Sequence, residues 1–287
     1  MNNYFKKNLV ILVSLVTFSC GTTKNEPVQS AEVPTEVKST APQSEAIKEL
    51  SNSPRHHEWV TLKHGSREFQ AFVVYPETSV KTKSIIVIHE NRGLDDWARS
   101  FADKLAAEGF LVIAPDFISN TQGKKRTTDF ENPDAARDAI YALEPAQVTA
   151  DLDAAYQFLK NDASATGEVA VIGFCWGGSQ AFRYVTNNKD VSQARVFYGT
   201  APTDEEALAG ITSPVYGYYG GDDNRVNSTI AKTEETMKAA NNFFQYEIYE
   251  GAGHAFMKSG LQPDAKEANK TALDQAWKRL LRILREK

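Results

Sequence analysis

The sequence predicts an α/β fold: a mostly parallel, doubly wound sheet with helices on both faces and an antiparallel hairpin at its N-terminal edge. Runs of β-branched and aromatic residues alternate with segments of helical spacing, which is the pattern of consecutive strand–helix units. Residues 84–89, SIIVIH, form a nearly continuous apolar run, as expected for a strand buried on both faces. In such sheets function lies at the carboxyl ends of the strands, so the residues after each strand are the candidates for a site.

The expected elements follow one another in a regular order. The edge hairpin covers 58–63 and 69–75, with Gly65 between its strands. Apolar residues three and four positions apart mark the helices, and Gly109 and Pro115 end the first helix and the strand after it. The buried strands are expected at 84–89, 111–114, 168–172, 194–198, 215–219 and 244–249. The helices are expected at 97–108, 133–143, 146–160, 178–186, 229–240 and 263–285.

The composition is that of a globular chain with a mild negative charge. Of 287 residues, 41% are hydrophobic and 24% charged, and 32 Lys and Arg against 37 Asp and Glu give a net charge of −5. This charge argues against a nucleic-acid partner and against electrostatic adhesion to anionic lipid, since both need a basic surface. The two cysteines, Cys20 and Cys175, form neither a disulfide framework nor a zinc-binding spacing. The sequence implies no metal and no organic cofactor, and we expect a monomer.

The first twenty residues have the pattern of a secretory signal. Lys6 and Lys7 precede the apolar run 9–18, which is too short to cross the ~30 Å of a bilayer core as a helix. The run ends in Ser19-Cys20, and a small residue followed by Cys at this point resembles the lipobox of bacterial lipoproteins. That resemblance implies a signal peptide over 1–19 and a mature chain that carries lipid on Cys20. The alternative is an ordinary signal peptide with a chance cysteine.

The next segment, 20–54, is expected to be a disordered tether. It is poor in large apolar residues and rich in Thr, Ser, Glu, Pro, Lys and Gln, so it buries too little apolar surface to offset the entropy of ordering. Within it, residues 45–50 are compatible with a marginal helical turn. The remaining residues, 55–287, are numerous enough for one α/β core.

Three strand ends carry the residues of a nucleophilic site. The strand 168–172 is followed by GFCWGG (173–178), which has the spacing of a nucleophile elbow with Cys175 in the place of Ser. Glycine fits the crowded positions two residues from the nucleophile because it has no Cβ. The helix that follows places its N-terminus at the thiol, and its partial positive charge is expected to favour the thiolate. The alternative is a buried core cysteine.

An acid and a histidine follow two later strands. After 215–219 comes GGDDNRV (220–226), in which Asp222 or Asp223 could orient an imidazole, although the same residues also favour a turn. After 244–249 comes EGAGHAF (250–256), whose His254 follows the acid in the chain. Nucleophile, acid, histidine is the chain order of α/β-hydrolases. The alternative for His254 is a solvated loop histidine.

These motifs resemble those of the dienelactone hydrolase family, the carboxymethylenebutenolidase-like group of the α/β-hydrolases. The resemblance covers about residues 58–284, and it is carried by IHENRGL (88–94), GFCWGG (173–178), GGDDNRV (220–226) and GAGHAF (251–256). It implies the α/β-hydrolase fold, and its G-x-x-D-x-x-V motif implies that the acid is Asp223. It also implies a catalytic Glu90, which takes the thiol proton when substrate enters. The alternative for Glu90 is a solvated side chain or an ion pair with Arg92.

The same resemblance implies an oxyanion hole and shows a departure in substrate binding. The backbone N–H groups of Asn91 and Trp176 are at the positions expected of the hole. Family members that act on dienelactone grip the substrate carboxylate with two arginines. Here Lys258 aligns with one of them, no Arg stands at the other position, and Arg92 and Arg126 are nearby candidates.

The sequence therefore predicts a hydrolase of small-molecule esters or lactones, with a Cys175–His254–Asp223 triad and an acyl-enzyme intermediate. The expected location is the bacterial cell envelope, with the domain outside the cytoplasm, on the periplasmic side, and joined to a membrane through the lipid on Cys20. The alternative is a catalytically inactive lipoprotein that binds a small molecule with the same fold. A thiol redox protein is disfavoured, because it needs a resolving cysteine.

Overall fold

The computed structural model describes residues 44–286. The expected signal peptide, the lipidation site Cys20 and most of the expected tether lie outside these residues. Among the described helices, none combines the length and the apolar character that crossing a membrane requires.

A single sheet organises the described residues, and its topology confirms the predicted fold class. Within residues 44–286 its strands are β1 (His57–His64), β2 (Arg67–Val74), β3 (Thr82–Ile88), β4 (Leu111–Asp116), β5 (Ala165–Phe174), β6 (Ala194–Phe197), β7 (Val215–Gly220) and β8 (Phe244–Tyr249). They lie in the order β1-β2-β4-β3-β5-β6-β7-β8. The hairpin of β1 and β2 is antiparallel, as predicted, and β2 also runs antiparallel to β4. All the other pairs are parallel, so the ends of β3 and β5 to β8 meet at one edge.

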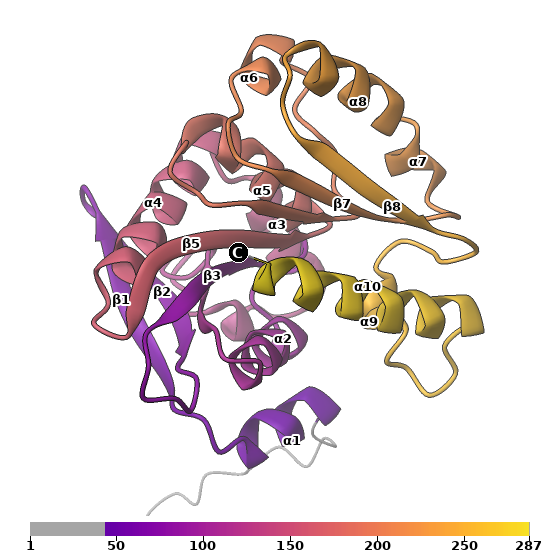
Figure 1. The fold of residues 1–287 in the computed structure, drawn as a ribbon. Helices are drawn as coiled ribbons and strands as arrows, with labels where there is room; N and C mark the ends of the chain where they lie inside the picture. Colours follow the sequence, from indigo (N-terminus) through magenta and orange to yellow (C-terminus); the bar gives the residue numbers. More distant parts are fainter. Residues whose placement is uncertain (1–43, 287) are drawn as a thin grey trace, which may run out of the picture. The chain divides into compact units, whose positions relative to one another are not determined.

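Helices cover both faces of this sheet (Figure 1). The described helices are α1 (Glu45–Asn52), α2 (Asp96–Ala107), the 3₁₀ turn η1 (Thr127–Asp129), α3 (Pro133–Tyr141), α4 (Pro145–Asn161), α5 (Trp176–Asn187), α6 (Glu205–Ala209), α7 (Asn224–Asn227), α8 (Ile230–Ala239), α9 (Phe256–Ser259) and α10 (Glu267–Arg285). On one face lie α2, α9 and α10, and on the other α3, α4 and α5. The expected last helix begins four residues later than predicted, because Pro263 lies in the turn before it.

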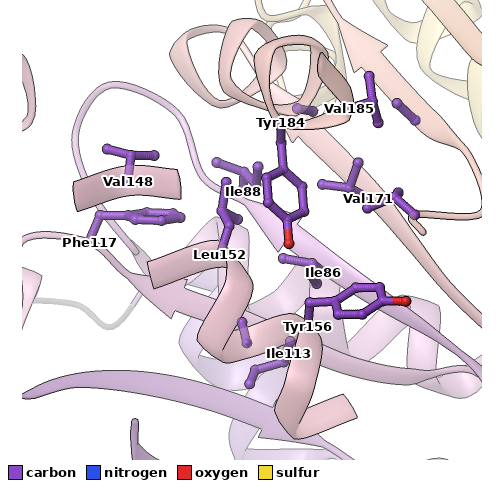
Figure 2. Packing of buried hydrophobic residues seen from close by; sticks show 14 of the residues in the cluster. Ile86, Ile88, Ile113, Phe117, Val148, Leu152, Tyr156, Val171, Tyr184 and Val185 are labelled. Carbon is purple, nitrogen blue, oxygen red and sulfur yellow. The ribbon is translucent and has the colours of Figure 1, made fainter. Parts of the chain in front are cut away.

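Strand β3 contributes side chains to both cores, which explains its continuous apolar sequence. Ile85 and Val87 pack beneath α2 and α10, while Ile86 and Ile88 point to the other face. Figure 2 shows this second face, where Leu152 of α4 and its neighbours pack over the strand residues. The two cores hold the central strands rigidly, and the loops at their carboxyl ends are built on that support.

The last part of the expected tether forms α1, a helix that contains the helical turn anticipated at 45–50 and is longer than it. None of the side chains in α1 is fully buried, but Leu50 is partly buried and packs against the core on the side of α2. The Ser44 hydroxyl caps its first turn. Glu49 accepts a hydrogen bond from the Ser100 hydroxyl of α2 at 2.5 Å and pairs with Lys104 at 3.0 Å. Composition alone does not reveal these contacts, because their partners lie about fifty residues further along the chain.

A buried carboxylate fastens the segment after α1 to α2. Asp103 accepts hydrogen bonds from the Ser53 hydroxyl at 2.7 Å and from Arg55 at 2.6 and 2.8 Å, and its Oδ1 lies 2.7 Å from His57 Nε2. Burial by itself would raise the pKa of Asp103, but hydrogen bonds from Arg55, Ser53 and His57 outweigh it and lower the pKa. This contact therefore stabilises the ionised carboxylate and the fold together at neutral pH.

We expect Asp103→Asn to lower the free energy of unfolding by about 2–4 kcal/mol at pH 7, because it leaves the Arg55 guanidinium without its counterion. Urea unfolding followed by circular dichroism measures the change. Since the pKa of Asp103 is lowered in the folded state, the stabilisation is present above the unfolded carboxyl's pKa, about 3.9, and is lost as the pH falls below it.

The matched control is Glu45→Gln, which removes an exposed ion pair with Lys48 and should leave the unfolding midpoint unchanged. Equal effects of the two variants would contradict the stabilising role of Asp103.

Candidate active site

Cys175 stands between β5 and α5 in a strained turn. Its backbone has φ 55° and ψ −115°, and a positive φ is rare outside glycine. A Cβ on Gly173 would lie 1.9 Å from the carbonyl oxygen of Gly177, and one on Gly177 would lie 2.3 Å from that of His89. The glycines of the motif are therefore a steric requirement of this turn. The turn places the thiol at the carboxyl edge of the sheet, where β3 and β6 also end.

The loops after β7 and β8 bring an acid and the histidine together. Asp223 is buried at the start of α7, and its Oδ2 lies 2.5 Å from His254 Nδ1. Asp222 is exposed, so the structure pairs the imidazole with Asp223 of the two candidates. A carboxylate at Nδ1 holds the ring in the tautomer whose Nε2 is free to accept a proton.

Cys175 and His254 line one cavity of about 640 Å³. Its walls come from the segments that follow five parallel strands, β3 and β5 to β8, and from α3 and α5. The lining residues are Glu90, Asn91, Tyr141, Cys175, Trp176, Ser179, Tyr198, Thr200, Arg225, His254 and Ala255. The structure therefore gathers the predicted nucleophile, histidine, glutamate and both amide-bearing residues around one space.

The thiol is protonated at rest. Burial raises the pKa of Cys175, and the Glu90 carboxylate raises it further. The backbone N–H groups of Trp176 and Asn91 act in the opposite direction, as does Arg225, but they do not reverse the shift. The N–H group of Trp176, at the N-terminus of α5, favours the thiolate as predicted, but desolvation is the larger contribution and keeps the pKa of the thiol raised. Attack by this sulfur needs a base that removes its proton.

Glu90 follows β3 and is poised to exchange a proton near neutral pH. Its side chain is only 15% exposed, and burial raises its pKa to about 7. Lys258 opposes this shift from 3.7 Å, Asp95 adds to it, and the Tyr198 hydroxyl opposes it by donating to Oε1 at 3.3 Å. A carboxyl group with a pKa near 7 can both accept and release a proton under physiological conditions.

The three cations predicted to bind substrate lie outside the lining of this cavity. Arg92 lies 3.5 Å from Asp134, and Arg126 stacks on an aromatic ring of β1 at 4.0 Å. Lys258 Nζ donates to Asp95 Oδ2 at 2.5 Å. Arg92 and Lys258 line a neighbouring cleft of about 1040 Å³ beside α1 and α2. Each expected cation already has a carboxylate or aromatic partner, and sequence spacing does not reveal such partners.

Sequence spacing also misses several side chains of the cavity, among them Tyr198, Arg225 and Tyr141. Tyr198, the first residue after β6, is buried with φ 40°, and its ring centroid lies 5.0 Å from that of His254. Arg225 is an exposed cation of α7, the short helix after β7, and Tyr141 also lines the cavity, with 63% of its surface exposed. Tyr198 lies inside the strand predicted at 194–198, whereas β6 ends at Phe197, so a search of the residues after each predicted strand passes over it.

Comparison with known proteins gives matches to one protein family. The model of the dienelactone hydrolase family matches residues 69–287. A provisionally named carboxymethylenebutenolidase of Methylorubrum extorquens is 29% identical over 197 residues, which are 65% of this chain and 67% of that protein. A provisionally named 2-oxo-3-(5-oxofuran-2-ylidene)propanoate lactonase of Bradyrhizobium sp. is 25% identical over 237 residues, covering 77% of this chain and 94% of that protein.

Solved structures of related chains have the same fold. A provisionally named dienelactone hydrolase from Klebsiella pneumoniae aligns with a TM-score of 0.71 at 22% identity, covering 81% of this chain and 99% of that one. P91, a dienelactone hydrolase-like promiscuous phosphotriesterase from metagenomic libraries, aligns with a TM-score of 0.68 at 21% identity, covering 80% and 97%. At these identities the likeness establishes the fold alone.

Proposed function

This chain belongs to the dienelactone hydrolase family as an ester or lactone hydrolase, and from that premise we propose that Cys175, His254 and Asp223 are its catalytic triad. One observation supports the triad above all others. The 2.5 Å contact between His254 and Asp223 lies beside the cavity that His254 shares with the thiol of the strained elbow. Nucleophile, base and orienting acid then stand in the roles that acyl transfer requires.

The first half-reaction forms a thioester on Cys175. As substrate enters, the thiol proton moves to Glu90, and the thiolate attacks the carbonyl carbon. The N–H groups of Trp176 and Asn91 stabilise the negative charge that develops on the carbonyl oxygen. The bond from carbon to the leaving oxygen then breaks, and that oxygen takes the proton from Glu90. The thioester and an ionised Glu90 remain.

The second half-reaction hydrolyses the thioester. His254 Nε2 takes a proton from a water molecule as its oxygen attacks the carbonyl carbon, and Asp223 stabilises the imidazolium that results. The carbon–sulfur bond breaks, and His254 passes the proton to the sulfur. The carboxylic acid leaves, and the Cys175 thiol is restored.

We propose a small ester or lactone as the substrate. Arg225 lines the cavity, whereas Lys258 is engaged with Asp95 outside it. This arrangement supports an anionic substituent that meets Arg225, in place of a carboxylate gripped by two arginines.

We also propose that lipid on Cys20 joins the mature chain to a membrane of the bacterial envelope, with the catalytic domain outside the cytoplasm. The support is the sequence alone, in which Lys6 and Lys7, the apolar run 9–18 and Ser19-Cys20 succeed one another. Burial of acyl chains gives stable anchoring when more than one chain is present.

Cys175→Ala should abolish hydrolysis of p-nitrophenyl acetate, because no other thiol lines the described cavity. Cys175→Ser should lower kcat/KM by at least about 10², since serine has no thiolate at neutral pH. Circular dichroism should show the fold unchanged in both variants. Activity of the alanine variant within tenfold of the wild type would refute Cys175 as the nucleophile.

Asp223→Asn should lower kcat by up to about 10⁴, because the imidazole that activates water for hydrolysis of the thioester then loses the partner that fixes its tautomer. Asp222→Asn is the matched control, one residue away and exposed, and should retain nearly full activity. Steady-state kinetics of the two variants decide which of the two carboxylates orients His254. A larger loss in Asp222→Asn would mean that the other carboxylate serves His254.

Cys20→Ala should move the protein from the membrane fraction to the soluble fraction and leave its specific activity unchanged. Acyl-chain burial stabilises membrane binding by about 0.8 kcal/mol per CH₂, so loss of the chains removes nearly all the affinity. Cell fractionation followed by immunoblotting measures the share of the protein in the membrane and soluble fractions. Signal-cleaved Cys20→Ala protein that still pellets with membranes would rule out the lipid anchor, whereas uncleaved precursor is itself an anchor and is scored separately.

A further inference from the structure

We propose that Asp95 is a positioning residue that holds Lys258 away from Glu90, so that Glu90 keeps a carboxylate free to take the thiol proton of Cys175. This inference rests on the proposed function, because it concerns how Glu90 acts in the first half-reaction. The observation that supports this proposal is the difference between two distances from the Lys258 ammonium. Lys258 Nζ lies 2.5 Å from Asp95 Oδ2 but 3.7 Å from Glu90 Oε2.

The backbone fixes both partners of the closer contact. Asp95 is the N-cap of α2, and its Oδ1 accepts a hydrogen bond from the Ala98 N–H at 3.0 Å, which leaves Oδ2 directed to the lysine. Lys258 belongs to the short helix α9, and its ammonium lies 5.7 Å from the centre of the Trp97 ring. The lysine is therefore held on the side of α2, at 3.7 Å from Glu90 Oε2, which is beyond hydrogen-bond distance.

The charges around Glu90 explain why this restraint matters. Glu90 is faced by Lys258 from α9, by Asp95 from the start of α2, by Tyr198 from the end of β6 and by Cys175 from the elbow. Burial, reinforced by Asp95, keeps the pKa of Glu90 near 7 against the opposing Lys258. If the ammonium bonded directly to Glu90, the carboxylate would be stabilised and would become a weaker base for the thiol.

Lys258 itself remains charged in this arrangement. Burial opposes its charge, but Asp95 and Glu90 together outweigh burial and the repulsion from Arg92, so the pKa of Lys258 is raised. Lys258 is thus a permanent cation close to Glu90, and the position of Asp95 decides whether its ammonium bonds to Asp95 or to Glu90.

Asp95→Asn tests this directly, because Asn keeps an oxygen for the helix cap and removes the charge. We expect Lys258 to close on Glu90. The acidic limb of the pH profile of kcat/KM should then move down by about one pH unit from its position near 7. The plateau should fall about tenfold because Glu90 is a weaker base. Alkylation of Cys175 by iodoacetamide at pH 8 should become about threefold faster, because a neutralised Glu90 no longer raises the thiol pKa.

Two controls separate this role from a structural one. Asp96→Asn alters the neighbouring carboxylate, which pairs with Arg99, and should leave both measurements unchanged. Asp95→Asn made in a Lys258→Met background should shift both measurements much less, because the cation to be released is absent and only the direct repulsion between Asp95 and Glu90 is lost. An equal shift in that background would overturn the proposal, since Asp95 would then act by direct repulsion. The proposal would also be overturned if the acidic limb of the kcat/KM profile of Asp95→Asn stayed at its wild-type position.

The alkylation measurement keeps this proposal distinct from the proposed function. Mass spectrometry of the peptide that contains Cys175 follows the reaction without any turnover of substrate. If the wild-type protein hydrolyses no ester, the proposed function fails, while the alkylation rates still decide the role of Asp95. Should Asp95→Asn be unstable to heat, Asp95→Ser provides a second capping residue without charge and the same expected shifts.

Discussion

The close backbone contact between the elbow and its neighbouring strands is the constraint on which the rest of the site depends. A Cβ on Gly177 would lie 2.3 Å from the carbonyl oxygen of the residue after β3, and one on Gly178 would lie 2.6 Å from that of the last residue of β6. Glycine alone permits such approaches. Because α5 is pressed against both strand ends, Glu90, Cys175 and Tyr198 share one cavity although they are far apart in the chain.

Burial at this edge of the sheet sets the protonation of the resting site. The same desolvation raises the pKa of Cys175 and brings the pKa of Glu90 to about 7, so a neutral thiol faces a carboxyl group that titrates near neutrality. A protonated thiol reacts slowly with oxidants and alkylating agents. The nucleophile therefore gains its reactivity from a proton transfer within the cavity, and the N-terminus of α5 serves mainly to supply the N–H group of Trp176.

Polar contacts outside the apolar cores decide where the folded domain begins. Apolar packing holds the central strands, whereas Asp103 and Glu49 hold α1 and the residues after it through hydrogen bonds and ion pairs. Such contacts leave no periodic signal in the sequence, because each depends on one pair of side chains that are distant along the chain. The same α1 lines the cleft beside Arg92 and Lys258, so the entry to the domain is also part of the surroundings of the site.

The sequence by itself determined the fold class and the kind of chemistry, because both rest on local patterns. Alternating apolar runs and helical segments specify the parallel sheet, and GFCWGG marks the elbow through steric demands that lie within six residues. Only the tertiary structure decided that Tyr198 joins the site and that Lys258 is bound by Asp95, and it pairs His254 with Asp223, the carboxylate that the family motif implies. These outcomes depend on distances of a few ångströms between residues from different strands and helices, and on the burial that their packing creates. Neither quantity is encoded in the spacing of residues along the chain.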